Sequence, residues 1–193
     1  MQQWVFEEAY GRYNIDLGDS NAPCLRVNQI GTLPDIELNY GKNIGTSKLR
    51  NLVGGLYGVP EYKIGITHGA QEALFLVYNY FLKKGDHVIT WSPGWEQAWK
   101  VPERIGCDVT TIPLSENMEF SLKGFLDAIK DKTKLIILNS PCNPSGREIS
   151  HEDKIELLRV IEEKSIYLVV DEEYLSDLRK SISNLSSNVI SVS

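Results

Sequence analysis

The sequence predicts an α/β fold in which a mostly parallel sheet is sandwiched by helices. Two observations indicate this class. Short apolar runs alternate along the chain with longer amphipathic runs, and the connections between apolar runs are long enough for helical crossovers. The chain has 193 residues, 42% of them hydrophobic, so it is long enough to bury a core.

Two segments differ in composition. Residues 1–40 are rich in Asn, Gly, Asp and Pro, as in NIDLGDSNAP, and show no sustained period, so we expect an irregular N-terminal arm. Residues 41–193 carry the alternating apolar runs and are expected to form the domain. No internal repeat or low-complexity linker interrupts them.

The elements of this domain follow from the period of the apolar residues. Helical spacing predicts helices from near Thr46 to Tyr57 and at Gln71–Lys84, Leu122–Lys130 and His151–Lys164, the last with Ser150 as its N-cap. Short apolar runs predict strands at Lys63–Thr67, His87–Trp91, Asp108–Pro113, Lys134–Asn139, Ile166–Val170 and Asn188–Val192.

The charge balance narrows the possible partners. A formal net charge of -6 without long runs of like charge argues against a nucleic-acid partner and against an anionic membrane surface. No apolar run approaches the roughly 20 residues that span a bilayer, and the start of the chain lacks the pattern of a signal peptide, so a cytoplasmic protein is expected. Cys24, Cys107 and Cys142 are scattered and lack histidines at ligand spacing, which predicts free thiols and no metal site.

In parallel sheets of this kind, ligands bind beyond the carboxyl ends of the strands. Four unusual sequences follow predicted strands and are expected to face one crevice: THGAQ, SPGWEQ, SPCNPSG and DEEY.

The first three loops offer groups that can hold a planar anionic ligand. THGAQ places free backbone N–H groups at a helix start, where they can surround a phosphate; the alternative is a tight turn that needs Gly69. Trp95 can lie flat on an aromatic ligand, or it fills core or an interface. Asn143 can donate a hydrogen bond through its amide, or the loop is a plain rigid turn. Neither GxGxxG nor GxxxxGK[ST] is present.

The fourth loop raises the question of why a buried strand ends in acids. A carboxylate such as that of Asp171 is costly there unless it meets a cation or several donors. The protonated pyridine nitrogen of a bound cofactor is such a cation, and Tyr174 can reach the phenolic oxygen of the same ring. Alternatively, Asp171 caps the following turn while Glu172 and Glu173 are solvated.

Together the four loops resemble those of the class I/II aminotransferases, which are fold-type I pyridoxal-phosphate (PLP) enzymes with an aspartate aminotransferase-like large domain. THGA, SPGW, NPSG and DEEY stand in the family's order at similar separations. The resemblance implies PLP as cofactor, with the backbone of Ala70 and Gln71 on its phosphate and Trp95 stacked on its ring. It also implies that Asp171 pairs with the ring nitrogen.

The resemblance has further consequences. It implies that Asn143 and Tyr174 share the phenolic oxygen of the cofactor. YGKNIGTSKLR resembles the family's early helix, in which the tyrosine, here Tyr40, reaches the phosphate of the neighbouring subunit, so a homodimer is implied. The Schiff-base lysine follows a strand resembling NVISVS in the family, and no lysine of this chain has that context, so the catalytic residue is unknown.

We therefore expect an N-terminal portion of an aminotransferase, which in complete form moves an amino group between an amino acid and a 2-oxo acid. A PLP-dependent lyase, decarboxylase or synthase of the same fold carries the same motifs. A non-catalytic pseudoenzyme remnant that dimerises through the surviving surface remains a further alternative, as does an α/β binding domain unrelated to the family.

Overall fold

The computed structural model describes residues 4–9, 11–15, 18, 20, 24–32, 35 and 39–193, in two compact units, Met1–Tyr40 and Gly41–Ser193. In the first unit, a π-helical segment (η1, Trp4–Ala9) and the short helix α1 (Val27–Ile30) are described. Where burial is described in this unit, only Ala9 is even partly buried. These residues therefore have no hydrophobic core of their own.

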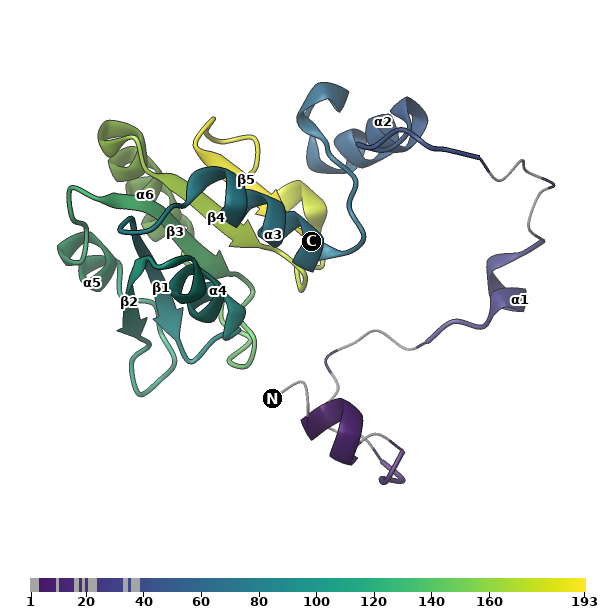
Figure 1. The fold of residues 1–193 in the computed structure, drawn as a ribbon, viewed down its shortest axis with the longest axis horizontal. Coiled ribbons are helices and arrows are strands. Elements are labelled where there is room, and N and C mark those ends of the chain that lie inside the picture. The colour runs from purple at the N-terminus through teal and green to yellow at the C-terminus, as the bar shows by residue number, and fades with distance from the viewer. Residues whose placement is uncertain are drawn as a thin grey trace. The chain divides into compact units, whose positions relative to one another are not determined.

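The second unit contains a five-stranded parallel sheet in the order β2-β1-β3-β4-β5 (Figure 1). Its strands are β1 (His87–Ser92), β2 (Asp108–Pro113), β3 (Thr133–Asn139), β4 (Tyr167–Asp171) and β5 (Val189–Val192). The strand order reverses between β1 and β3, which makes the edge beyond these two strands the expected place for a ligand. The predicted fold class is confirmed.

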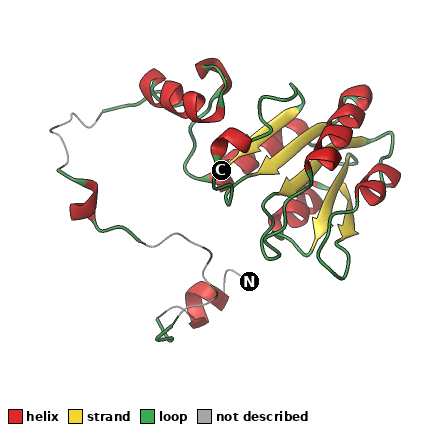
Figure 2. Cartoon of the chain, turned by 180° about the vertical axis from the view of Figure 1, so that it is seen from behind, coloured by secondary structure: helices red, strands yellow, loops and turns green. Residues whose placement is uncertain are grey.

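Four helices cover the two faces of the sheet in the same unit, and one further helix lies across a cavity from the edge strand β5 (Figure 2). They are α2 (Ser47–Tyr57), α3 (Ala70–Phe81), α4 (Gln97–Ile105), α5 (Leu122–Asp127) and α6 (His151–Lys164), with 3-10 turns at η2 (Glu61–Lys63) and η3 (Leu178–Lys180). Side-chain caps set the starts of three of these α-helices. The Thr46 hydroxyl accepts from Leu49 N, the Ser121 hydroxyl from Gly124 N at 3.2 Å, and the Ser150 hydroxyl from Asp153 N at 3.1 Å.

The two faces of the sheet carry separate cores because successive strand residues point to opposite sides. In β3, Leu135 and Ile137 belong to the cluster that includes residues of α3 and α4. Ile136 and Leu138 belong to the cluster that includes residues of α5 and α6. All four side chains are at most 2% exposed, so β3 is the buried centre of the sheet.

The predicted strand at Lys63–Thr67 is wrong. Lys63 ends the turn η2, and residues 64–67 pair with no strand of the described chain. Ile64 is extended, and Ile66 N donates to Ile44 O at 3.2 Å, but no ladder forms. A strand needs a neighbour for its backbone groups, and this segment lies apart from the edge strand β5 across a cavity.

Helix α4 was not predicted. Its sequence, QAWKVPERI, contains Pro102, which removes a backbone donor and argues against a helix when the sequence is considered alone. Here Pro102 is buried, and its neighbours Val101 and Ile105 pack against the sheet, so tertiary packing outweighs the proline. Helix α3 ends at Phe81, not at the predicted Lys84, because Leu82 is already extended.

Candidate functional site

The carboxyl ends of β3 and β4 lie side by side and form the floor of the candidate site. In the register of this pair, Asn139 is opposite Asp171. The backbone N–H of Ser140 donates to Asp171 O at 2.9 Å, and the Asn139 side-chain amide donates to the same oxygen at 3.1 Å. Both loops that follow therefore start from one rigid edge.

Asn143 and Tyr174, which were predicted to act on one atom of a ligand, are in direct contact. The Asn143 amide donates to the Tyr174 hydroxyl at 3.0 Å. Asn143 is itself held by Asn139, whose side-chain oxygen accepts from Asn143 N at 2.8 Å. Asn139 thus links the strand, the loop and β4, a role that sequence reasoning missed. Its only signal was a second asparagine in the loop sequence NSPCN.

Asp171 is a half-buried acid that forms no ion pair with a described residue. Its Oδ1 accepts from Glu173 N at 3.1 Å, which is the turn cap that the alternative interpretation expected. Among the described ion pairs none includes Asp171. Burial raises the pKa of this carboxyl to about 6, and the neighbouring carboxylates Glu173 and Glu172 add to the rise, while the Glu173 N–H opposes it. A cationic ligand atom would relieve this cost.

Glu172 has a structural role that the sequence did not reveal. It is 4% exposed, so the alternative in which Glu172 is solvated is wrong for this residue, whereas Glu173 is exposed. The Ser181 hydroxyl donates to Glu172 Oε2 at 2.6 Å, and Ile182 N donates to Oε1 at 3.4 Å. These bonds tie the loop after β4 to the segment before β5, which holds the loop that carries Tyr174.

Trp95 lies on the loop between β1 and α4 and is half-buried. Its indole N–H is buried and has no hydrogen-bond partner among the described residues. By contrast, Trp91 is 3% exposed and fills the core, so the core-filling alternative applies to Trp91. Trp95 combines a partly accessible aromatic surface with a polar atom that lacks a partner, as expected for a residue that contacts a ligand.

Ala70 and Gln71 are the first two residues of α3. The N-cap Gly69 has a φ of 81°, which favours glycine, and no side chain caps the helix. The start of this twelve-residue helix therefore offers backbone donors and the positive end of its dipole. Glu72 reaches back to His68, accepting from its backbone N–H at 2.5 Å, and this bond lowers the pKa of Glu72.

Tyr40 is the last residue of the first unit and is described only within it. Its side chain is fully exposed, and its backbone N–H donates to Asn39 Oδ1 at 2.7 Å.

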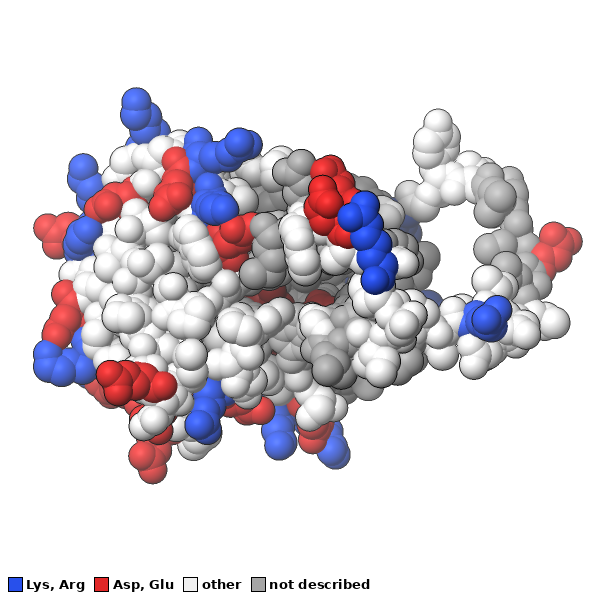
Figure 3. Space-filling model, turned by 90° about the horizontal axis from the view of Figure 1, so that it is seen from below, with Lys and Arg blue, Asp and Glu red and all other residues white. Residues whose placement is uncertain are grey.

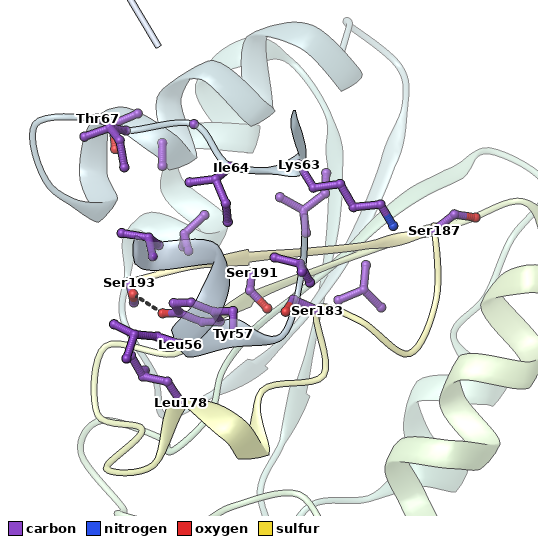
Figure 4. A pocket seen from close by; sticks show the side chains of 18 of the residues that line it. Leu56, Tyr57, Lys63, Ile64, Thr67, Leu178, Ser183, Ser187, Ser191 and Ser193 are labelled. Carbon is purple, nitrogen blue, oxygen red and sulfur yellow. Dashed lines mark hydrogen bonds between the residues drawn. The ribbon is translucent and has the colours of Figure 1, made fainter. Parts of the chain in front are cut away.

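A cavity of about 630 Å³ lies between β5, the end of α2 and the segment Lys63–Thr67 (Figure 4). Its lining includes Val192, which pairs with Asp171 in the sheet. The hydroxyls of Tyr57 and Ser193 share a hydrogen bond of 2.6 Å at this cavity. None of the predicted cofactor residues lines it. Residues Lys63–Thr67, which were predicted to form a strand, line this cavity opposite β5 and do not pair with it.

The described part of the chain contains no group of three or more His, Cys, Asp and Glu side chains that could hold a metal, and none of its helices is long and apolar enough to cross a membrane. Cys24, Cys107 and Cys142 are free. On the face drawn in Figure 3, basic and acidic side chains are interspersed, with no large patch of one sign.

Sequence comparisons identify relatives for most of the chain. The model of the family "Aminotransferase class I and II" matches residues 23–184. A probable aspartate aminotransferase of Methanocaldococcus jannaschii is 30% identical over 148 residues, which cover 74% of this chain and 40% of that protein. A histidinol-phosphate aminotransferase of Vibrio vulnificus is 32% identical over 138 residues, with coverage of 67% and 39%.

Solved structures of aminotransferases are also similar to this chain. A PLP-dependent aminotransferase from Streptococcus suis matches with a TM-score of 0.67 and 30% identity, covering 75% of this chain and 38% of that one. A variant of the aspartate aminotransferase of Thermus thermophilus matches with a TM-score of 0.66 and 28% identity, covering 69% and 39%. The chain thus spans about two fifths of the length of these relatives.

Proposed function

Because this chain belongs to the class I and II aminotransferase family, we propose that it is the cofactor-binding portion of a PLP-dependent aminotransferase that moves an amino group between an amino acid and a 2-oxo acid. The observation that carries the proposal is Asp171. It is a half-buried acid with a raised pKa and no described cation, at the sheet edge where Asn143 and Tyr174 meet.

The residues at this edge fit the cofactor. Asp171 would hold a proton at the pyridine nitrogen, since an ionised carboxylate favours a cationic partner. Asn143 and Tyr174 would donate to the phenolic oxygen. Trp95 would lie on the ring. When bound, PLP supplies an electron-withdrawing ring that stabilises negative charge at the substrate α-carbon.

The phosphate would bind at the start of α3. The backbone N–H groups of Ala70 and Gln71 belong to a helix end that no side chain caps, which suits a dianion. Tyr40 of a second subunit would add a hydroxyl to the same group. The chain's lysines lack the sequence context of the family's catalytic lysine, so the catalytic residue is not assigned.

A homodimer with shared sites is part of the proposal. Its support is a set of exposed apolar side chains on α2 and α3 that a monomer would leave in water. They are Leu49, Leu52 and Leu56 on α2, and Phe75, Leu76 and Tyr80 on α3. Analytical ultracentrifugation tests this, with Leu52→Glu expected to lower the association. We also propose a cytoplasmic location, in keeping with the free thiols; cell fractionation tests it.

Cofactor binding is the decisive experiment. PLP is titrated at pH 8 into the purified chain, and binding is followed by the PLP absorbance and by quenching of tryptophan fluorescence. We expect Asp171→Asn to weaken binding by about 10- to 100-fold, since a hydrogen bond to a charged group contributes roughly 1.5–3 kcal/mol. Glu173→Gln, next but one in sequence and exposed, is the matched control.

Equal affinities for Asp171→Asn and Glu173→Gln would refute the cofactor assignment. The reaction class needs a second measurement, on a chain that spans the full length of the relatives. Formation of a 2-oxo acid from an amino acid supports transfer. Release of carbon dioxide, or elimination products without a 2-oxo acid acceptor, would instead favour a decarboxylase or lyase.

A further inference from the structure

Tyr78 carries a buried hydroxyl that the site described so far does not use. It lies in the middle of α3, the helix whose start is assigned to the phosphate, and it is 1% exposed. Its hydroxyl has no hydrogen-bond partner among the described residues. Most buried polar groups are paired, and an orphan costs free energy, so an unpaired hydroxyl in a core calls for an explanation.

Tyr78 packs on the face of the sheet to which the Asp171 side chain points. Tyr78 packs in the same core cluster as Val169 of β4. Asp171 is two residues further along β4 than Val169, so both side chains point to the face that α3 covers. Burial raises the pKa of the Tyr78 hydroxyl, and the negative charge of Asp171 adds to this rise, in keeping with the two side chains lying on the same face of the sheet.

The chemistry of the two groups is complementary. The raised pKa of Tyr78 keeps the hydroxyl protonated, so it can donate a hydrogen bond. Asp171 accepts one described bond, from Glu173 N to Oδ1, and no described group donates to Oδ2. The other charged groups near Asp171 are Glu172 and Glu173, which oppose its ionisation, and the Asn139 amide is already bound to the main-chain oxygen of Asp171.

We propose that Tyr78 is a positioning residue of the cofactor site, whose hydroxyl donates to the Asp171 carboxylate when that carboxylate ionises and so holds it ready for a cationic ring nitrogen. The proposal deepens the proposed function and rests on it for the identity of the cation. The proposed hydrogen bond between Tyr78 and Asp171 does not depend on that identity. It can therefore be measured without any cofactor.

The first test is a titration of the Asp171 side-chain carbon by carbon-13 NMR in the cofactor-free chain, with Asp171→Asn used to assign the signal. We expect Tyr78→Phe to raise the pKa of Asp171 by about one unit, because a donor to the ionised form is lost. Tyr80→Phe removes a hydroxyl from the same helix at an 83% exposed position and should leave the titration unchanged.

A second variant guards against a folding defect in Tyr78→Phe. Replacing Tyr78 by 3-fluorotyrosine keeps the shape and makes the phenol a stronger donor, so the pKa of Asp171 should fall. Shifts in opposite directions for the two variants support a hydrogen bond. An unchanged titration in the fluorinated chain, or a Tyr78→Phe signal identical to that of Tyr80→Phe, overturns the proposal and leaves Tyr78 as a packing residue.

A cofactor measurement separates this proposal from the proposed function. If Tyr78→Phe moves the pKa of Asp171 from about 6 to about 7, PLP affinity should drop about fivefold at pH 6 and less than twofold at pH 8, since the ionised fraction differs only at the lower pH. Shifted titrations in a chain that does not bind PLP would retain the Tyr78 contact and reject the cofactor. Equal losses at both pH values contradict the ionisation role.

Discussion

Two segments of similar sequence differ in backbone pairing: β3, at the centre of the sheet, and Lys63–Thr67, which lies across the cavity from β5. KLIILN forms the buried strand β3, with neighbours on both sides. KIGIT has the same mixture of Ile with polar ends, yet residues 64–67 form no ladder, and a cavity separates them from β5. Strand propensity is thus a preference that a neighbouring backbone must satisfy.

Hydrogen exchange should show the largest contrast between the two regions. The backbone N–H groups of Ile136 and Leu138, in β3, should exchange about a thousandfold more slowly than those of Gly65 and Thr67, after correction for intrinsic rates. Core amides open only with much of the domain, whereas unpaired amides need no such opening. Comparable protection in both segments would show that Lys63–Thr67 has found a partner.

Replacing one isoleucine in each segment by alanine should lower the free energy of unfolding more in β3 than in Lys63–Thr67. Ile136→Ala removes a fully buried side chain and should lower the free energy of unfolding by about 3–5 kcal/mol. Ile66→Ala removes a half-buried one and should cost about 1 kcal/mol. Urea denaturation measures both. A larger loss of stability for Ile66→Ala than for Ile136→Ala would show that the segment Lys63–Thr67 belongs to the cooperatively folded core.

Asp171 should make the second unit less stable as the pH rises. Its folded pKa of about 6 lies above the ordinary 3.8, so the folded state binds the proton more tightly, and stability is lost as the pH rises through about 4 to 6. Asp171→Asn should therefore be similar to the parent near pH 4 and about 3 kcal/mol more stable near pH 8, at roughly 1.4 kcal/mol per pKa unit.

Glu173→Gln serves as the comparison for this measurement, because Glu173 is exposed and two residues away. Since the Glu173 carboxylate adds to the rise in the Asp171 pKa, this variant should show a change in the same direction that is much smaller than that of Asp171→Asn. Denaturation midpoints across the pH range decide the outcome. A gain for Asp171→Asn that is equal at pH 4 and pH 8 would mean that the carboxyl is not destabilised by burial, and the case for a cationic ligand would lose its support.

The smallest effect is expected at the cavity beside β5. Tyr57→Phe removes the hydrogen bond with Ser193 and should lower the stability by about 0.5–1 kcal/mol, since one neutral bond contributes little net free energy. Tyr62→Phe, at an 80% exposed position in the same region, should change nothing. A loss above about 2 kcal/mol would show that this bond closes the cavity wall.

Much of the second unit was predictable because local signals agreed with the tertiary fold. The helix His151–Lys164 was placed at its observed bounds because Ser150 is a strong N-cap and the following residues favour a helix. Three loops that follow β1, β3 and β4 were recognised by unusual residues after apolar runs, whereas the fourth, THGAQ, leads into α3 but follows no strand. By contrast, α4 was missed because Pro102 opposed it locally while packing favoured it.

The sequence by itself determined the parallel α/β class, the order of most elements and the family, because periodicity and short motifs are local properties of the chain. The tertiary structure alone decided which neighbours each residue has. It buried Glu172 against Ser181, linked Asn143 through Asn139 to β4, and left KIGIT without a neighbouring strand. Contacts between residues distant in sequence depend on strand register and on which backbone groups find partners, and a local pattern carries neither.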